Sequence, residues 1–461
     1  MSRMNRVSRV GLELSALLVL ATPIIIAQVA HTAMGAVDAV MAGRVSPADL
    51  AAVALGNSIW IPLYLLMTGI LMATTPKVAH RFGAGKLNEI GPLVRQALWL
   101  GLAIGLCFAI LLTQARPVLH LMQVEPGLVE PTLGYLRGVA FGFPAAALYQ
   151  VLRCYSDALN QTLPSMIIGL LGLLINIPLN YVLIHGKLGL PALGGVGCGW
   201  ATGLVMIAML LGMAGWVNRS PHYRFSALFR HFEPPRWSLI SALLRVGLPI
   251  GVAIFAEASI FSVIALLIGG LGATVVSGHQ IALSISSLVF MVPLSLAMAV
   301  TVRVGQALGR NAPRDARFAA VLGIGVALVY ACFSATLMML FRERIAGFYS
   351  PDPAVVALAS TLLIYAALFQ FSDGIQVSAA GALRGYQDTR AVMLITLPSY
   401  WGIGLSVGYM LGLTNLLGAP SGPAGLWQGL IVGLSCAALM LGWRLHVRAG
   451  RAIHCMASAQ G

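Results

Sequence analysis

The stretch PIGVAIFAEASIF, residues 249–261, contains one charged side chain, Glu257, inside a run of apolar residues. No other Asp, Glu, Lys or Arg occurs between Arg245 and Arg303. This apolar run predicts a membrane-spanning helix, since about 20 apolar residues cross a bilayer. A charge at the centre of such a helix costs roughly 2.5–3.5 kcal/mol on insertion scales, so Glu257 is expected to face a cavity, a partner or a proton.

The composition of the whole chain agrees with a membrane protein. Of its 461 residues, 59% are hydrophobic and only 9% are charged, whereas soluble domains carry about 25% charged residues. The six cysteines show no paired spacing, so neither a disulfide framework nor a zinc site is indicated. The formal charge of +14 does not indicate nucleic-acid binding, because the basic residues do not form one face of a soluble domain.

Runs of about 20 apolar residues predict an all-α polytopic protein with twelve transmembrane helices. The predicted spans are 13–38, 50–75, 93–113, 132–152, 165–185, 193–216, 238–268, 278–302, 317–340, 355–382, 391–413 and 423–446.

The positions of the basic residues predict the orientation of these spans. An even number of spans places both termini on one side, and that side receives most of the 28 Lys and Arg residues. The opposite side keeps Arg44, Arg116, Arg137, Lys187, Arg342 and Arg344. By the positive-inside rule, both termini are expected to be cytoplasmic, in a bacterial inner membrane. No cleavable signal peptide is expected, because the first apolar run is too long and has no small-residue cleavage site.

The two halves of the chain repeat each other. A shift of 226 residues places Pro23 on Pro249 and Lys77 on Arg303, and a shift of 227 places Trp200 on Trp427. We therefore expect two six-helix lobes in the same orientation around a central cleft, the geometry of alternating access. The predicted parts are a cytoplasmic N-terminus (1–12), an N-terminal lobe (13–217), a basic, Pro-containing linker (218–237), a C-terminal lobe (238–446) and a cytoplasmic tail (447–461).

Three carboxylates lie well inside the predicted spans: Asp38, Glu257 and Asp373. The repeat places His31 opposite Glu257 and Ala146 opposite Asp373, so symmetry does not explain these acids. Helix packing against a polar neighbour is one interpretation, and ion or substrate handling is the one favoured for intramembrane acids. A carboxylate in apolar surroundings holds a proton more tightly than in water, or binds a cation where other oxygens surround it.

Several longer segments resemble the multidrug and toxic compound extrusion (MATE) family, in its NorM-type branch. They are AVDAVMAGRVSPADLAAVALGNSIW (36–60), KVAHRFGAGK (77–86), NIPLNYVLIHGKLGLPALGGVGCGWAT (176–202), GLPIGVAIFAEASIF (247–261) and ALRGYQDTR (382–390). The resemblance implies twelve helices in two lobes and export of cationic amphipathic drugs in exchange for H⁺ or Na⁺.

The resemblance also implies roles for individual residues. It makes Asp38, Glu257 and Asp373 the ion-coupling acids, and it places Asn176 and Asn180 near Asp38. It matches Asp352, within SPDP, to a loop acid of the family, although a helix N-cap is the plain interpretation there. Gln280 is a candidate supporting polar residue, with interhelical hydrogen bonding as its alternative role.

Phe290 bears on the coupling ion. Family members that bind Na⁺ offer a Tyr hydroxyl at the matching position of the eighth helix, and a phenyl ring supplies no oxygen to a hard cation. H⁺ is therefore the favoured coupling ion, with Na⁺ at Glu257 and Asp373 as the alternative. Asp38, Glu257, Phe290 and Asp373 are expected to line the drug cleft.

Three functional classes are compared. A secondary antiporter for lipophilic cationic drugs is favoured, with membrane lipids around it, no cofactor, no nucleic acid and no obligate protein partner. A flippase for lipid-linked precursors would need Arg or Lys in its cleft, and the basic residues are predicted outside the spans, with Arg384 as a cytoplasmic anchor. An enzyme is not expected, because no nucleophile, metal cluster or His-Asp set has a recognisable spacing.

Overall fold

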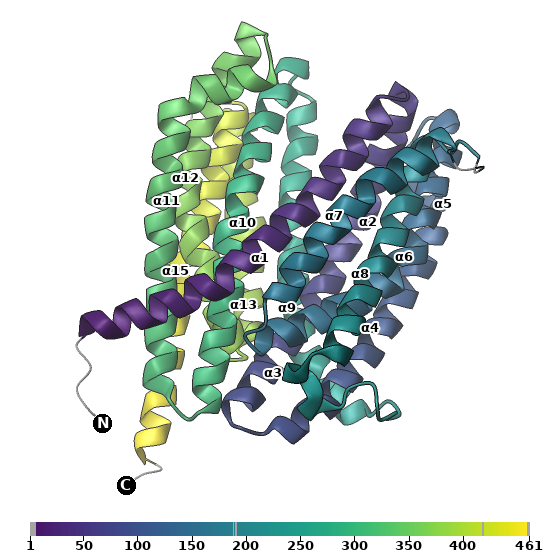
Figure 1. Cartoon of the computed structure of the whole chain (residues 1–461). Coiled ribbons are helices and arrows are strands. Elements are labelled where there is room, and N and C mark those ends of the chain that lie inside the picture. Colours follow the sequence, from purple (N-terminus) through teal and green to yellow (C-terminus); the bar gives the residue numbers. More distant parts are fainter. Residues whose placement is uncertain (1–5, 188, 190, 417–418, 459–461) are drawn as a thin grey trace. The chain divides into compact units, whose positions relative to one another are not determined.

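The computed structural model describes residues 6–187, 189, 191–416 and 419–458, and within these residues every regular element is a helix (Figure 1). Helices satisfy their backbone hydrogen bonds internally, which a hydrocarbon environment requires. Eleven helical segments of the described chain are long and apolar enough to cross a membrane. The structure thus confirms the all-α polytopic class.

The helices are α1 (Arg6–Gly43), α2 (Pro47–Leu71), α3 (Thr74–Gly83), α4 (Ile90–Thr113), α5 (Arg116–Leu121), α6 (Pro126–Ala158), α7 (Leu163–His185), α8 (Gly195–Arg219), α9 (Trp237–Gly269), α10 (Ala273–Gly309), α11 (Pro313–Tyr349), α12 (Pro353–Gly385), α13 (Thr389–Leu397), α14 (Leu405–Leu413) and α15 (Pro423–Ser458). Short 3-10 turns follow α3 (Leu87–Glu89) and α8 (Pro221–Ser226), and a π-helix (Pro398–Gly404) joins α13 to α14. Most predicted spans lie within one longer helix, but span 50–75 crosses the break between α2 and α3, span 193–216 begins two residues before α8, and span 391–413 covers α13, a π-helix and α14.

The predicted span 132–152 lies in α6, which is not among the eleven apolar segments. This 33-residue helix is long enough to cross a bilayer. Arg137, Gln150 and Arg153 lower its hydropathy, and the last two are buried.

The chain forms two compact units, which divide inside α1 and α9. Unit 2 is Thr22–Gly251, and unit 1 combines Met1–Ala21 with Val252–Gly461. In unit 2, α6 packs against α8 along glycines, and a Cβ on Gly142 would lie 2.5 Å from the Cα of Gly203. Such close backbone approach is how membrane helices pack without large apolar side chains between them.

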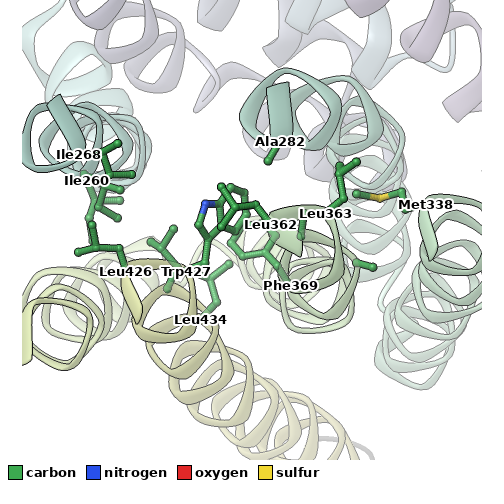
Figure 2. Close-up of a cluster of buried hydrophobic side chains, with 14 of the residues drawn as sticks. Ile260, Ile268, Ala282, Met338, Leu362, Leu363, Phe369, Leu426, Trp427 and Leu434 are labelled. Atoms are coloured by element: carbon green, nitrogen blue, oxygen red, sulfur yellow. The ribbon is translucent and has the colours of Figure 1, made fainter. Parts of the chain in front are cut away.

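The core of unit 1 surrounds α12. Figure 2 shows its central cluster, in which Trp427 of α15 lies among apolar side chains that include Ile260 of α9 and Phe369 of α12. Trp427 is fully buried, and its indole Nε1 donates to His279 Nδ1 over 3.2 Å. His279 is therefore a packing residue with a defined partner.

The linker, residues 218–237, docks onto α4 and α6 of unit 2. Arg95 of α4 donates to Glu233 from both Nε (3.1 Å) and Nη2 (2.5 Å), while its Nη1 donates to the carbonyl of Ala227. Tyr223 is buried against α6, and burial raises its pKa to about 12, with the nearby Asp157 charge acting in the same direction. The Tyr223 hydroxyl group therefore stays protonated. The linker is an ordered segment that packs against α4 and α6 of unit 2.

The first turns of α1 belong to unit 1. Glu13 accepts two hydrogen bonds from Arg303 of α10, from Nε over 2.8 Å and from Nη2 over 2.6 Å. Arg9 pairs with Asp315 of α11 over 2.6 Å and stacks on Phe318. Two ion pairs therefore attach this segment to unit 1.

Candidate functional site

Unit 2 contains a buried N-terminal polar cluster of Asp38, Asn176, Asn180 and Thr202. Asp38 Oδ1 accepts from Asn180 Nδ2 (2.6 Å) and Asn176 Nδ2 (3.1 Å), and its Oδ2 accepts from Thr202 Oγ1 (2.8 Å). Asp38 is 4% exposed, and both asparagines are fully buried. The predicted neighbourhood of Asp38 with Asn176 and Asn180 is thus present in the structure.

Three helices build this cluster. Asn176 and Asn180 are one turn apart on α7 and face the same side, and Asn180 Nδ2 also donates to Asn176 Oδ1 over 3.0 Å. Thr202 comes from α8, and the sequence interpretation missed it because a single Thr in an apolar helix carries no specific signal. Every donor around Asp38 is neutral, so its carboxyl group can gain or lose a proton without breaking an ion pair.

Unit 1 contains a C-terminal acidic cluster of Glu257, Asp373, Arg384 and Tyr400. The charges of Glu257 and Asp373 interact with each other, and that of Glu257 interacts with Arg384. Tyr400 interacts with all three of these charged groups. Asp373 is 1% exposed, whereas Glu257 on α9 is partly buried.

Many polar atoms near this cluster are buried and unpaired. Among the described residues, neither carboxylate oxygen of Asp373 has a hydrogen-bond partner, and the same holds for Arg384 Nε and the Tyr400 hydroxyl. Leaving a buried polar group unpaired costs roughly 1–3 kcal/mol, more for a charged one. A fold that keeps several such groups together is therefore suited to receive protons, ions or a polar ligand.

The π-helix provides Tyr400, which the sequence interpretation missed. Its first residue, Pro398, lacks the N–H that an α-helix would use, and π segments are frequent at functional sites. Trp401 Nε1 donates to the carbonyl of Ala256, the residue before Glu257. The π-helix is thus hydrogen-bonded to α9 next to Glu257, and it supplies the Tyr400 hydroxyl to the C-terminal acidic cluster.

The position of Arg384 differs from the sequence-based prediction. It was expected as a cytoplasmic anchor, but its side chain is buried, with 6% exposure, in the last turn of α12. Arg153 is likewise buried, and its Nε lies 3.8 Å from Asp157 Oδ2. Arg153 and Arg384 lie just after the predicted spans 132–152 and 355–382, but the helices continue past these spans and bury both side chains, and the charge of each interacts with that of an acid.

Three further predicted residues are not members of these clusters. Asp352 is exposed and caps α12, accepting from the N–H of Ala354 over 2.9 Å; it precedes Asp373 by 21 residues, roughly 30 Å along the helix. Gln280 of α10 is exposed, and its buried neighbour is His279. Phe290 is partly buried on α10. The structure thus shows the plain N-cap role for Asp352.

The described residues include no group of three or more His, Cys, Asp or Glu side chains arranged to hold a metal ion. Carboxylates buried inside long apolar helices are instead typical of membrane transport proteins that move ions or charged solutes. The fold and the two clusters define a protein of this class.

The MatE family model matches the chain twice, over residues 23–182 and 249–410. The two matches confirm the internal repeat, and the chain belongs to the MatE family, the multidrug and toxic compound extrusion transporters.

Relatives with curated names cover almost the whole chain. The multidrug resistance protein PmpM of Pseudomonas aeruginosa is 63% identical over 451 residues, which is 98% of this chain and 94% of that protein. A protein named "Probable multidrug resistance protein NorM", from Shewanella oneidensis, is 48% identical over 446 residues, covering 96% of this chain and 97% of that protein. The crystal structure of the eukaryotic MATE transporter AtDTX14 shares the fold, with a TM-score of 0.87, 20% identity and coverage of 97% of this chain and 99% of that chain.

Proposed function

We propose that the protein is a cation-coupled efflux antiporter that exports lipophilic cationic drugs by alternating access. The observation that carries the proposal is the C-terminal acidic cluster, in which the buried Asp373 carboxylate has no hydrogen-bond partner among the described residues. Buried carboxylates select cations, while apolar walls bind compounds of varied shape. The names of the relatives, which describe multidrug resistance proteins, support the same activity.

We propose H⁺ as the coupling ion and retain Na⁺ at Glu257 and Asp373 as the alternative. The positive charge of Arg384 acts on Glu257 and would also repel a Na⁺ bound there, whereas a proton transferred to the carboxylate needs no open coordination site. Phe290 supplies no oxygen. Na⁺ remains the alternative because Tyr400 interacts with Glu257 and Asp373, and its hydroxyl oxygen could serve as a ligand for a hard cation.

The proposed location is a bacterial inner membrane with both termini cytoplasmic, supported by the distribution of Lys and Arg. We propose Asp38 of unit 2 and the C-terminal acidic cluster of unit 1 as the acidic groups that the protein uses during alternating access. Arg153 forms an ion pair with Asp157, and the charge of Arg384 interacts with that of Glu257, so these two buried arginines do not indicate a cleft for large anionic lipids. The flippase alternative is therefore not favoured.

Efflux from cells tests the substrate class. Cells that produce the protein are expected to extrude cationic dyes and to resist cationic antibacterials, and anionic compounds of similar lipophilicity are expected to accumulate as in control cells. Glu257→Gln is expected to abolish the efflux while the amount of folded protein stays near normal. Resistance to anionic compounds alone would contradict the proposal.

A sodium pulse decides the coupling ion. Dye-loaded cells are held at constant pH with a protonophore and then receive NaCl, or choline chloride as the control. With H⁺ as the coupling ion, efflux is expected to stay at the level of the protonophore-treated cells after both additions. Efflux restored by NaCl alone would replace H⁺ by Na⁺ and leave the role of Glu257 intact.

A further inference from the structure

A groove of about 300 Å³ lies within unit 2, between the linker and α4. Its apolar walls include Leu98 and Leu102 of α4 and Leu148 of α6, and the linker contributes Phe229, His231 and Phe232. Neither buried cluster includes any of these residues. The groove is therefore a separate feature of the molecule.

The groove changes from polar to apolar along α4. Arg95, Leu98 and Leu102 are three and four residues apart, so they share one face of the helix. The Arg95–Glu233 ion pair lies at one end. Leu102 lies 12 residues after the first residue of α4, roughly 18 Å along a helix that crosses a hydrocarbon core of about 30 Å. This gradient matches an amphipathic molecule with its polar end at the membrane surface.

The linker around the polar end carries excess positive charge. Glu233 is the single acid between residues 218 and 237, and Arg95 already neutralises it. Arg230 stands between the groove residues Phe229 and His231 and is exposed, and the described chain contains no ion pair for it. Arg230 thus gives the loop beside the groove an exposed cation that could attract an anionic headgroup.

Aromatic side chains on the linker indicate that it lies at the level of the lipid headgroups. Phe232 is 82% exposed and Trp237 71% exposed, and aromatic residues are enriched at membrane interfaces. Phe232 also makes an edge contact with Trp99, with ring centroids 5.9 Å apart. Phe232 therefore adds an exposed apolar ring to the wall of the groove.

We propose that this groove binds one anionic phospholipid. Its phosphate lies against Arg230 and His231, and the upper part of an acyl chain follows Leu98, Leu102 and Leu148. The volume is at the lower end of ligand pockets, roughly 300–1,000 Å³, so the tails continue into the bilayer. Binding in the cytoplasmic leaflet rests on the proposed orientation, but the site itself does not.

Native mass spectrometry of the purified full-length protein tests the site with added phosphatidylglycerol or phosphatidylcholine. We expect one phosphatidylglycerol to bind at least fivefold more tightly than phosphatidylcholine. Arg230→Gln is expected to weaken this binding about fivefold, the effect of one basic side chain near an anionic lipid. The matched control is Arg310→Gln, an exposed arginine at the end of α10, for which we expect less than a twofold change.

The apolar part of the groove is tested by filling it. Leu102→Trp is expected to reduce phosphatidylglycerol binding at least fivefold, and Leu148→Phe on α6 is the second variant should Leu102→Trp not fold. Equal binding of the two lipids, equal losses in Arg230→Gln and Arg310→Gln, full displacement by inorganic phosphate, or undiminished binding in a folded filling variant would each overturn the proposal. None of these outcomes depends on drug transport, so the proposed function can fail separately.

Discussion

At the scale of single residues, Asp38 and Asp373 are buried to a similar extent but have different partners. Asp38 accepts from Asn176, Asn180 and Thr202, whereas Asp373 has no hydrogen-bond partner among the described residues. A satisfied carboxylate is held in one position, and an unsatisfied one is ready to take a proton or a cation. The two acids therefore differ in how readily each can bind a further proton or cation.

Asp38→Asn is expected to abolish export while the amount of folded protein stays near normal. The amide keeps the size of the side chain, but it cannot carry the negative charge, and its NH₂ group would face a donor. Rates of dye efflux, normalised to protein in the membrane, measure the effect. Thr202→Val, which removes one donor, is expected to slow export only severalfold.

The matched control is Asp49→Asn on α2. Asp49 lies in the first turn of α2 and accepts hydrogen bonds from Ser46 Oγ and from the N–H of Gly195, the first residue of α8, both over 2.6 Å. Its role is capping, worth about 1 kcal/mol, so export is expected to persist. Wild-type export by Asp38→Asn would instead favour a packing role for this acid.

At the scale of helices, α14 and α15 approach each other along two rows of glycines. Gly404, Gly408 and Gly412 follow one another at four-residue intervals on the π-helix and α14, as Gly425, Gly429 and Gly433 do on α15. A Cβ on Gly429 would lie 2.3 Å from the Cα of Gly408. Because both contact atoms are backbone, the helices would have to separate to make room.

Gly429→Val is expected to destabilise the protein by roughly 1–3 kcal/mol, the usual cost of overpacking. It should also move the π-helix, which packs on the same row through Gly433. The midpoint of thermal unfolding in detergent measures the effect. Gly442→Val is the control, because a Cβ there on the same helix has no heavy atom within 4 Å; equal midpoints for the two variants would contradict the close-packing argument.

At the scale of the whole molecule, the two units do not follow the order of the chain. The first turns of α1 belong to unit 1, although the rest of the helix belongs to unit 2. The pair between Glu13 and Arg303 joins this segment to α10, with side chains 17% and 20% exposed. The carboxylate and the guanidinium are partly shielded from water, so removing either one destabilises the protein more than breaking an exposed ion pair does.

Glu13→Gln is expected to lower the free energy of unfolding by about 1–3 kcal/mol, because it leaves the partly buried Arg303 without its counterion. The charge-reversed double variant Glu13→Arg/Arg303→Glu is expected to recover much of the loss. Thermal unfolding of the purified variants provides the measurement. Arg9→Gln, which breaks the exposed pair with Asp315, should cost at most about 1 kcal/mol; no difference between Glu13→Gln and Arg9→Gln would argue against a structural role for the inner pair.

The sequence by itself determined the class of the protein, the positions of its helices and the acids inside them. These features are local, since 20 consecutive apolar residues and one carboxylate among them can be recognised without knowing what they contact. The family resemblance further implied that Asn176 and Asn180 lie near Asp38, and the structure confirms this proximity.

The tertiary structure alone decided which side chains meet across helices. Thr202 reaches Asp38 because α8 packs beside α7, and Tyr400 joins the C-terminal acidic cluster where a π-helix interrupts the predicted span 391–413. Arg384 was misplaced from sequence because a basic residue at the end of an apolar run usually faces water. Arg384 is buried by the helices packed around it. The hydropathy of one segment does not show which side chains of other segments pack against it.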